Sequence, residues 1–295
     1  MTAEPSRAAF IAALAPLPRV ARGCDLFFTA AAWGAGVAGL LLPFGILAYL
    51  AWEGAARVSW VFLTRAPAGS APGAEGGIAP AILGTAAMVA LAICFALPLG
   101  LAAAIGLVEY TPPNSRAARA LRFGAECLAA TPAIVFGLFG YAVLVVLFGF
   151  RISLLSGALT LGLMMLPIIL IGAEEALRSV EPSLREAALS MGVSRWHVTR
   201  RIVLPRAWPG ILAVAALAGG HAAGSAAPVI LTAAVAFARG VPTLDAPAMT
   251  LPTHLYFLVS EGGDLEQAYA TALALVCGLL IANLCAGALK RRLAR

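Results

Sequence analysis

Six long apolar runs constrain this chain more than any other feature of its sequence. They lie at about residues 26–50, 81–108, 125–150, 152–171, 209–235 and 269–289. A helix needs about 20 predominantly apolar residues to cross the hydrocarbon core of a bilayer. The runs therefore predict an all-α, polytopic membrane protein with six transmembrane helices. Little more than Arg151 separates the third run from the fourth, so either Gly149 and Phe150 belong to a very tight turn or the two helices are tilted.

Charged residues are too scarce for an ordinary soluble domain. They make up 12% of the 295 residues, while hydrophobic residues make up 61%. Soluble domains carry about 25% charged residues, because they have a polar surface to cover. The composition therefore agrees with a chain that is largely embedded in a membrane.

The basic residues are distributed asymmetrically about the apolar runs. Sixteen of the 20 Lys and Arg residues lie near the two termini or in the second-to-third and fourth-to-fifth connections. Only Arg57, Arg65, Arg151 and Arg239 lie on the other side. Cytoplasmic loops collect positive charge, so both termini are predicted to be cytoplasmic. The asymmetry also accounts for the net charge of +6 without a nucleic-acid partner, which would need a basic face on a soluble domain.

The chain divides into three predicted parts. Residues 1–25 are expected to form a cytoplasmic tail, because they lack the clean apolar core of a signal peptide. Residues 26–75 contain the first span and an external loop with at most one short helix, and residues 76–295 contain the other spans. The second external connection, residues 236–268, is acidic and rich in proline, and is expected to be a loop.

The connection over residues 173–208 predicts a helix–turn–helix at the membrane surface. Pro182 is typical of a helix start, Gly192 of a corner after a helix, and Ser194 of the cap of a second short helix. Pro205 is expected to end that helix before the fifth span. An apolar stripe at helical spacing consists of Leu184, Ala187, Ala188 and Met191. Such a hairpin can lie in the lipid interface, but its small residues favour the close approach of another protein.

This connection resembles the EAA loop of ABC-importer permeases. The residues that match, at the spacing usual in that family, are Glu186, Ala187, Ala188, Gly192, Ile202, Leu204 and Pro205. The resemblance implies that the loop docks in a groove of an ABC ATPase and that ATP-driven closure of the ATPase dimer switches the membrane helices. The chain has no G-x-x-x-x-G-K-[ST] phosphate loop. ATP and Mg are therefore expected on separate subunits, and this chain is expected to be non-catalytic, without a cofactor or metal of its own.

Further motifs resemble the phosphate-importer permeases of the PstA type over residues 76–295. They are Gly76-Gly77-Ile78, Ile82-Leu83-Gly84-Thr85, Glu109-Tyr110, the segments 132–140, 166–169 and 174–177, and Leu251-Pro252. The resemblance implies the type I importer-permease (MetI-like) fold and a place in the bacterial inner membrane. It also implies three partners: an ABC ATPase dimer, a second and homologous permease, and an extracytoplasmic solute-binding protein. The implied substrate is inorganic phosphate or a related oxyanion.

The sequence departs from this family at three positions that are usually charged. Ile171 and His221 stand where the family has arginine, and Ser225 stands where it has glutamate. Ionisable groups inside a membrane are costly and usually functional, and arginine binds oxyanions with two parallel hydrogen bonds. The resemblance places His221, Gly224, Ser225 and Asn283 in the translocation pathway. A polar residue packed against a neighbouring helix is the other interpretation of His221.

Three interpretations of these departures remain open. A partner permease supplies the missing charges and phosphate still passes, or the importer carries another solute, or the chain is a non-transporting assembly or sensing subunit. An intramembrane enzyme would need a catalytic cluster such as HExxH or paired aspartates, and neither occurs in the spans. His197 and His254 are expected at the surface. The hydroxyls of Thr85, Thr160 and Thr232 are expected to bond to their own helix backbones.

Overall fold

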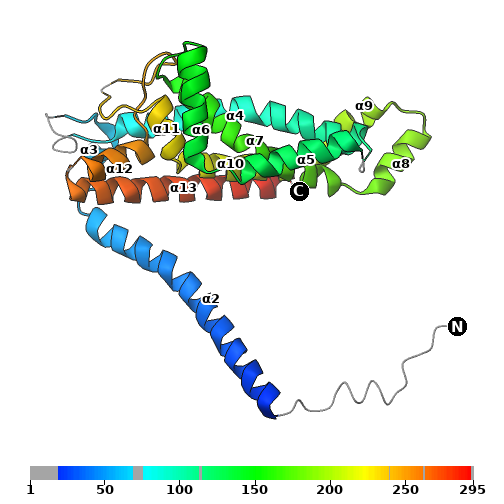
Figure 1. Ribbon diagram of the computed structural model, residues 1–295, viewed down its shortest axis with the longest axis horizontal. Coiled ribbons are helices and arrows are strands. Elements are labelled where there is room, and N and C mark those ends of the chain that lie inside the picture. The colour runs from blue at the N-terminus through cyan, green and yellow to red at the C-terminus, as the bar shows by residue number, and fades with distance from the viewer. Residues whose placement is uncertain (1–18, 69–75, 113–114, 239, 262, 294–295) are drawn as a thin grey trace. The chain divides into compact units, whose positions relative to one another are not determined.

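The computed structural model describes residues 19–68, 76–112, 115–238, 240–261 and 263–293 (Figure 1). Within these ranges the regular structure is helical and contains no strand, so the predicted all-α class is confirmed. The chain divides into two compact units, residues 1–49 and 50–295. Most of the predicted cytoplasmic tail lies outside the described residues.

The first unit contains most of helix α2 (Arg19–Gly54). Its 30 residues from Asp25 to Gly54 are long and apolar enough to cross a membrane, as predicted for residues 26–50. Large apolar side chains point outward all along it, with Phe27 and Trp33 about 70% exposed. A helix that is apolar on every side is typical of a membrane span.

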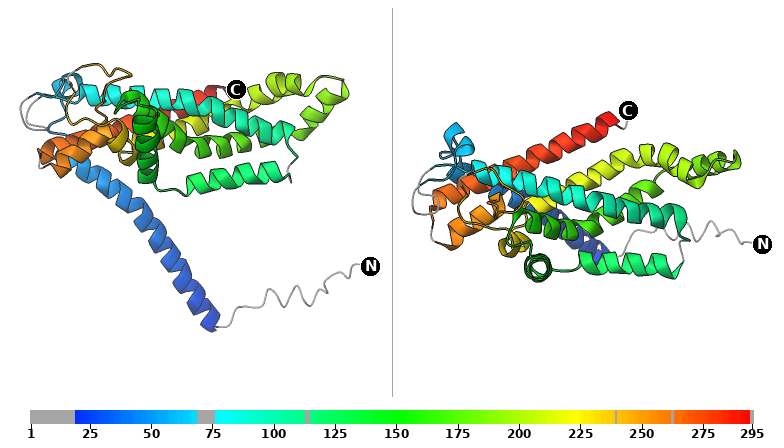
Figure 2. Two further views of the ribbon diagram at one scale, coloured as in Figure 1. Left: turned by 45° about the horizontal axis from the view of Figure 1, so that its top comes forward. Right: turned by 90° about the horizontal axis from the view of Figure 1, so that it is seen from above.

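Four long helical spans run side by side in the second unit (Figures 1 and 2). They are α4 (Ala79–Ile105) with η1 (Gly106–Tyr110), α7 (Leu154–Arg178), the run α9–η3–α10 described below, and α13 (Leu265–Leu293). The main core lies between α4 and α7, around Met88, Met165 and Ile169. Small residues allow these helices to approach closely, since a Cβ on Gly100 would lie 2.7 Å from the Ile169 side chain.

The third predicted span, residues 125–150, is wrong as a continuous helix. The segment consists of α5 (Arg116–Ala129) and then α6 (Ala133–Gly140) with the π-helical η2 (Tyr141–Leu147), bent by 100° relative to α5. Pro132 causes the break, because its ring disfavours a helical backbone at Thr131 and it has no N–H to donate. Figure 1 shows α6 lying across the long helices, and the right-hand view in Figure 2 shows it end-on. The described residues thus contain five helices that are long and apolar enough to cross a membrane, or six when this bent pair is counted as one span.

The predicted tight turn between the third and fourth spans is confirmed. Gly149 and Arg151 both have left-handed backbones, with φ of +69° and +60°. The following helix, α7, begins among loop carbonyls, because the N–H groups of Ser153, Leu154 and Leu155 donate to residues 232, 246 and 244. The first N–H groups of a helix have no partner within it, so the end of α11 and the loop that follows it complete the start of α7.

Both predicted ends of the fifth span, residues 209–235, are wrong. The helix begins with α9 (Arg195–Val198), continues through the π-helical η3 (Thr199–Val203), and ends with α10 (Leu204–Ala223). Pro205 therefore does not end a helix, because the π-helical turn before it accommodates its missing N–H. After Gly224 the chain turns and forms the short helix α11 (Ala227–Thr232).

The end of the second unit that holds α3 (Trp60–Thr64) and α12 (Leu251–Ser260) is more ordered than predicted. The prediction allowed one short helix such as α3, but α12 lies within the predicted acidic loop. The Thr85 hydroxyl accepts a hydrogen bond from the Leu251 N–H at 2.8 Å, and a Cβ on Gly84 would overlap with the Met249 carbonyl oxygen. The Gly84-Thr85 motif therefore holds the start of α12 against α4. Arg57 and Asp264 form an ion pair at 2.9 Å at the same end.

Candidate functional site

The predicted helix–turn–helix is present at the end of the second unit opposite α3 and α12 (Figure 1). Its first helix, α8 (Pro182–Ser190), begins at the predicted proline. Gly192 has a φ of +77°, the left-handed backbone that glycine adopts without strain. The Ser194 hydroxyl accepts a hydrogen bond from the His197 N–H and caps α9, as predicted. Local sequence signals thus predicted this hairpin correctly.

The EAA-type residues fall on two faces of the hairpin. Glu186, Ala187, Gly192 and Pro205 are exposed, whereas Ala188 is buried and Ile202 and Leu204 are half-buried. The buried face packs on an apolar cluster that includes Leu177, Val198 and Val203. The predicted stripe is only partly correct, because Ala187 is exposed and Met191 is 81% exposed. The exposed face therefore combines one carboxylate with small and apolar residues that a partner would cover.

Arg185 attaches α8 to the rest of the second unit. Its Nε lies 3.1 Å from Oε1 of Glu109 in η1, and its two terminal nitrogens donate to the carbonyl oxygens of Val180 and Leu177. The side chains of Arg185 and Glu109 are 17% and 10% exposed, so solvent screens this pair only weakly. The two carbonyls belong to the end of α7 and the turn after it, where the helix dipole favours a cation.

A second polar cluster joins α5 to α7 on the same side of the protein. Glu174 accepts hydrogen bonds from Arg122 at 2.7 Å and from Arg178, one turn further along α7, at 3.0 Å. The Glu174 side chain is 11% exposed. A buried carboxylate is stable only when it is paired, and here two guanidinium groups pair with it. Glu174 belongs to the segment 174–177 that resembles the importer family, and it holds α5 against α7. The contact persists although the chain bends at Pro132 after α5.

Three predicted pathway residues lie together at the end of α10. His221 is exposed, Gly224 follows the last residue of the helix, and the Ser225 hydroxyl donates to the His221 carbonyl oxygen at 2.9 Å. Asn283 on α13 joins them, because a Cβ on Gly220 would lie 3.5 Å from its side-chain oxygen. The structure therefore brings the four pathway candidates to one region of α10 and α13.

Ile171 lies apart from this group. It is 41% exposed on α7, and the next residue, Gly172, lies against the side chain of Val214 on α10. Val214 precedes His221 by seven residues, or about 10 Å along the helix. Positions 171 and 221, where the resembling family has arginine, are therefore not neighbours within one chain.

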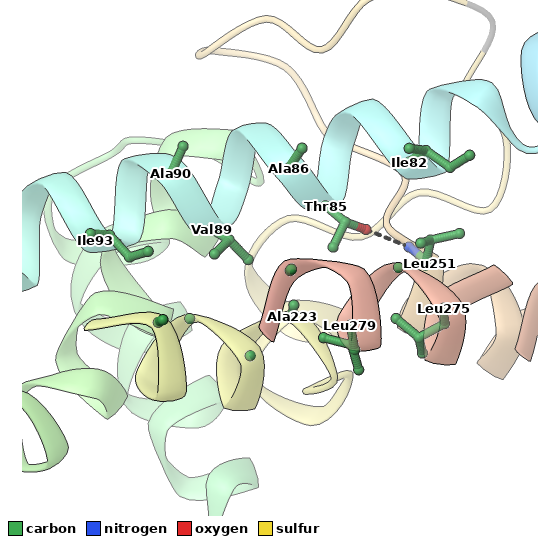
Figure 3. Close-up of a pocket in the computed structure, with 15 residues that line it drawn as sticks. Ile82, Thr85, Ala86, Val89, Ala90, Ile93, Ala223, Leu251, Leu275 and Leu279 are labelled. Atoms are coloured by element: carbon green, nitrogen blue, oxygen red, sulfur yellow. Dashed lines mark hydrogen bonds between the residues drawn. The ribbon is translucent and has the colours of Figure 1, made fainter. Parts of the chain in front are cut away.

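The pocket in Figure 3 offers no site for an oxyanion. It has a volume of about 410 Å³ and lies between α4, α10 and α13. Thr85 carries the single polar side chain of its lining. Its hydroxyl is already used, because it donates to the Ala81 carbonyl and accepts from the Leu251 N–H, which is the dashed line in Figure 3. The predicted self-bonding of Thr85, Thr160 and Thr232 is confirmed.

The prediction that His254 lies at the surface is wrong. Its side chain on α12 is 2% exposed, and neither ring nitrogen has a hydrogen-bond partner in the described part of the chain. Gln267 and Thr271 on α13 also have buried polar atoms without partners there. No local signal indicated this burial, because it arises from the packing of α12 against α13. Burial lowers the pKa of His254 to about 4.

We expect acid to destabilise the protein through His254. The unfolded chain binds a proton near pH 6.5, whereas the folded chain resists protonation down to about pH 4. Stability should therefore fall as the pH drops through this window, by about 3 kcal/mol in total. Thermal unfolding in detergent at pH 7.5, 6 and 4.5 measures the effect. His254→Leu should flatten the profile and the exposed control His197→Gln should not, so an unchanged profile in His254→Leu would contradict the assignment.

Known proteins share both the sequence and the fold. Residues 96–295 match the family described as binding-protein-dependent transport system inner membrane component. The probable ABC transporter permease protein YqgI of Bacillus subtilis (strain 168) is 32% identical over 257 residues, covering 82% of this chain and 86% of YqgI. The phosphate transport system permease protein PstA 1 of Mycobacterium tuberculosis (strain CDC 1551 / Oshkosh) is 33% identical over 217 residues, covering 73% and 71%. A chain of the inward-facing MetNI methionine ABC transporter superposes with a TM-score of 0.64 at 20% identity, covering 73% of this chain and 95% of that chain.

Proposed function

Since the chain belongs to the family of binding-protein-dependent transport system inner membrane components, and is the permease of an ABC importer, we propose that it carries inorganic phosphate or a related oxyanion. It is a multi-pass protein of the PstA type with a MetI-like fold. The solute is the proposed part of this assignment. Its support is the likeness to the phosphate permease PstA 1 over 73% of the chain.

The exposed face of the hairpin is the proposed ATPase-docking surface. Glu186, Ala187 and Gly192 are open to a partner, while Ala188 holds the hairpin on the apolar cluster beneath. This division into an exposed and an anchoring face is the observation that supports docking most directly. The ATPase subunits hydrolyse ATP with Mg, and the permease itself is non-catalytic.

The other proposed partners follow from the family. A second, homologous permease completes the pathway, and an extracytoplasmic binding protein delivers the solute at the end that holds α3 and α12. With the hairpin in the cytoplasm, both termini are cytoplasmic, in agreement with the excess of basic residues on that side. The group formed by His221, Gly224, Ser225 and Asn283 then lines the pathway.

A different solute is the second candidate, because the charges expected of an oxyanion pathway are missing from this chain. Ile171 and Ser225 carry no charge, and His221 lacks the guanidinium group that binds an oxyanion with two parallel hydrogen bonds. The pocket in Figure 3 supplies no donor either. A phosphate pathway must therefore take its cations from the second permease, whereas a neutral solute would need none.

Uptake by reconstituted vesicles tests the proposal. Proteoliposomes are prepared with this permease, its partner permease and the ATPase, with the binding protein outside the vesicles. They should accumulate labelled phosphate only when ATP is present in the lumen, on the side of the ATPase. Unlabelled arsenate should compete, and a neutral sugar or amino acid should not. Accumulation of a neutral solute instead of phosphate would establish the second candidate.

The control distinguishes a wrong solute from a wrong class of protein. Glu186→Lys reverses a charge on the docking surface and should reduce the ATPase retained in mild detergent by about ten-fold. Retention by the unaltered chain with no uptake of any solute would indicate an assembly or sensing subunit. A chain that retains no ATPase at all would contradict docking at the hairpin.

A further inference from the structure

We infer that Arg185 is the positioning residue through which movement of the docking hairpin reaches α4 and α7. The inference rests on the proposed function, since it requires an ATPase that moves the hairpin. It goes further by naming the contact that transmits the movement. Arg185 lies next to Glu186 in sequence, yet its side chain points away from the docking surface and into the protein.

In the described residues, Arg185 forms the side-chain hydrogen bonds that join α8 to other helices. In the described part of the chain, the other side-chain hydrogen bonds of α8 are local, from Ser183 to Glu181 and from Ser190 to Ala187. Ala188 and Leu184 contribute apolar contacts to the cluster beneath. Apolar contacts have no preferred direction, so they allow α8 to rock over the cluster. Hydrogen bonds require alignment, and those of Arg185 therefore oblige its partners to follow α8.

Arg185 binds two spans at once. Glu109 belongs to η1 at the end of α4, whereas the carbonyl oxygens of Leu177 and Val180, at 2.6 and 2.5 Å, belong to the end of α7 and the turn after it. A guanidinium group can bridge in this way because its five donors lie in one rigid plane. A lysine has a single charged nitrogen and cannot hold all three positions with the same geometry.

The two helices of the hairpin are thus connected to different parts of the fold. Helix α9 is continuous with α10, which ends at the His221 group. Helix α8 is tied through Arg185 to α4 and α7, whose mutual contact forms the main core. Closure of an ATPase under the hairpin therefore moves α10 and the α4–α7 pair together when Arg185 is present. Without Arg185, the short link of residues 179–181 and the continuous helix into α10 still hold the hairpin, but α8 loses its hydrogen bond to Glu109 at the end of α4.

The test compares ATPase binding with transport in the complete importer. Arg185→Met removes all three hydrogen bonds but leaves the exposed docking face unchanged. ATPase retention should stay within about two-fold of the unaltered protein, while uptake falls about ten-fold or more and ATP hydrolysis loses its stimulation by the binding protein. Arg185→Lys, which keeps the ion pair with Glu109, should recover part of this coupling. Arg116→Met, an exposed arginine outside the hairpin, is the matched control and should transport normally.

Two results would overturn the inference. One is Arg185→Met with uptake and stimulation within about two-fold of the unaltered importer. The other is a loss of ATPase retention as large as the loss of uptake, which would show that Arg185 only shapes the docking surface. Glu109→Gln supplies a second variant that does not alter α8, and full coupling in it would also count against the bridge. An importer that moves no phosphate contradicts the proposed solute but not this inference, because stimulated hydrolysis is measured independently of the solute's identity.

Discussion

Gly192→Asp should abolish transport while the permease still folds into the membrane. Gly192 forms the exposed corner between α8 and α9 with a φ of +77°, and no atom lies within 4 Å of the position that a Cβ would occupy. The strain of a left-handed aspartate is therefore about 1 kcal/mol, too little to unfold the protein. At the interface the new carboxylate would be desolvated without a partner, which costs far more.

Co-purification measures this prediction directly. We expect the ATPase retained by Gly192→Asp to fall about a hundred-fold and ATP-dependent uptake to be lost. Gly192→Asn is the matched control, because asparagine has the same shape, tolerates the left-handed backbone and carries no charge. It should retain more ATPase than the aspartate variant. Equal retention by Gly192→Asp and the unaltered chain would place the docking surface elsewhere.

Gly84→Ala should destabilise the protein strongly, because the methyl group that it adds to α4 meets backbone atoms. The added Cβ would overlap with the Met249 carbonyl oxygen, which belongs to backbone and cannot rotate away. Helix α4 and the segment before α12 would have to separate, and the hydrogen bond from the Leu251 N–H to Thr85 would be lost with them. Overpacking of this kind costs about 3 kcal/mol, and an orphaned buried N–H adds about 1–3 kcal/mol.

Thermal unfolding in detergent should show a midpoint roughly 10 °C lower for Gly84→Ala. Gly124→Ala is the control, because Gly124 lies within α5 with open space where its Cβ would be. Alanine is a better helix former than glycine by about 0.5–1 kcal/mol, so this control should be as stable as the unaltered protein or slightly more. Similar midpoints for the two variants would refute the close contact between Gly84 and Met249.

Local signals predicted most of the helices correctly. Run length placed the first and sixth spans within α2 and α13, the second within α4 and η1, and the fourth on α7 but starting two residues early. In the hairpin, Pro182, Gly192 and Ser194 occupy the helix start, the left-handed corner and the cap, because each role depends on a residue's own chemistry. The resemblance to importer permeases, carried by spaced motifs, is confirmed by the family match over residues 96–295.

The remaining features were missed for two reasons: hydropathy does not register local helix breaks, and contacts between distant residues leave no local signal. Hydropathy alone joined residues 125–150 into one span, although Pro132 breaks it, and extended the fifth span past Gly224 to residue 235. His254 looks polar in the sequence but is buried by the packing of α12 on α13. The partners of Arg185 are separated from it by as many as 76 residues, so no spacing rule links them. The roles of the pathway residues stay predictions, supported by the grouping of His221, Ser225 and Asn283.

With an ATPase docked as proposed, the helix from Arg195 to Ala223 would act as a lever arm. Its 29 residues extend over about 43 Å, with the proposed docking corner at one end and His221 near the other. A tilt of about 10° about the α9 end would swing His221 through about 7 Å. A modest rotation at the α9 end would therefore displace His221 by more than the diameter of a small dehydrated solute. The mechanical gain of the importer is then set by the distance between the corner and His221, and inserting one helical turn between them should change the stroke while leaving both ends chemically intact.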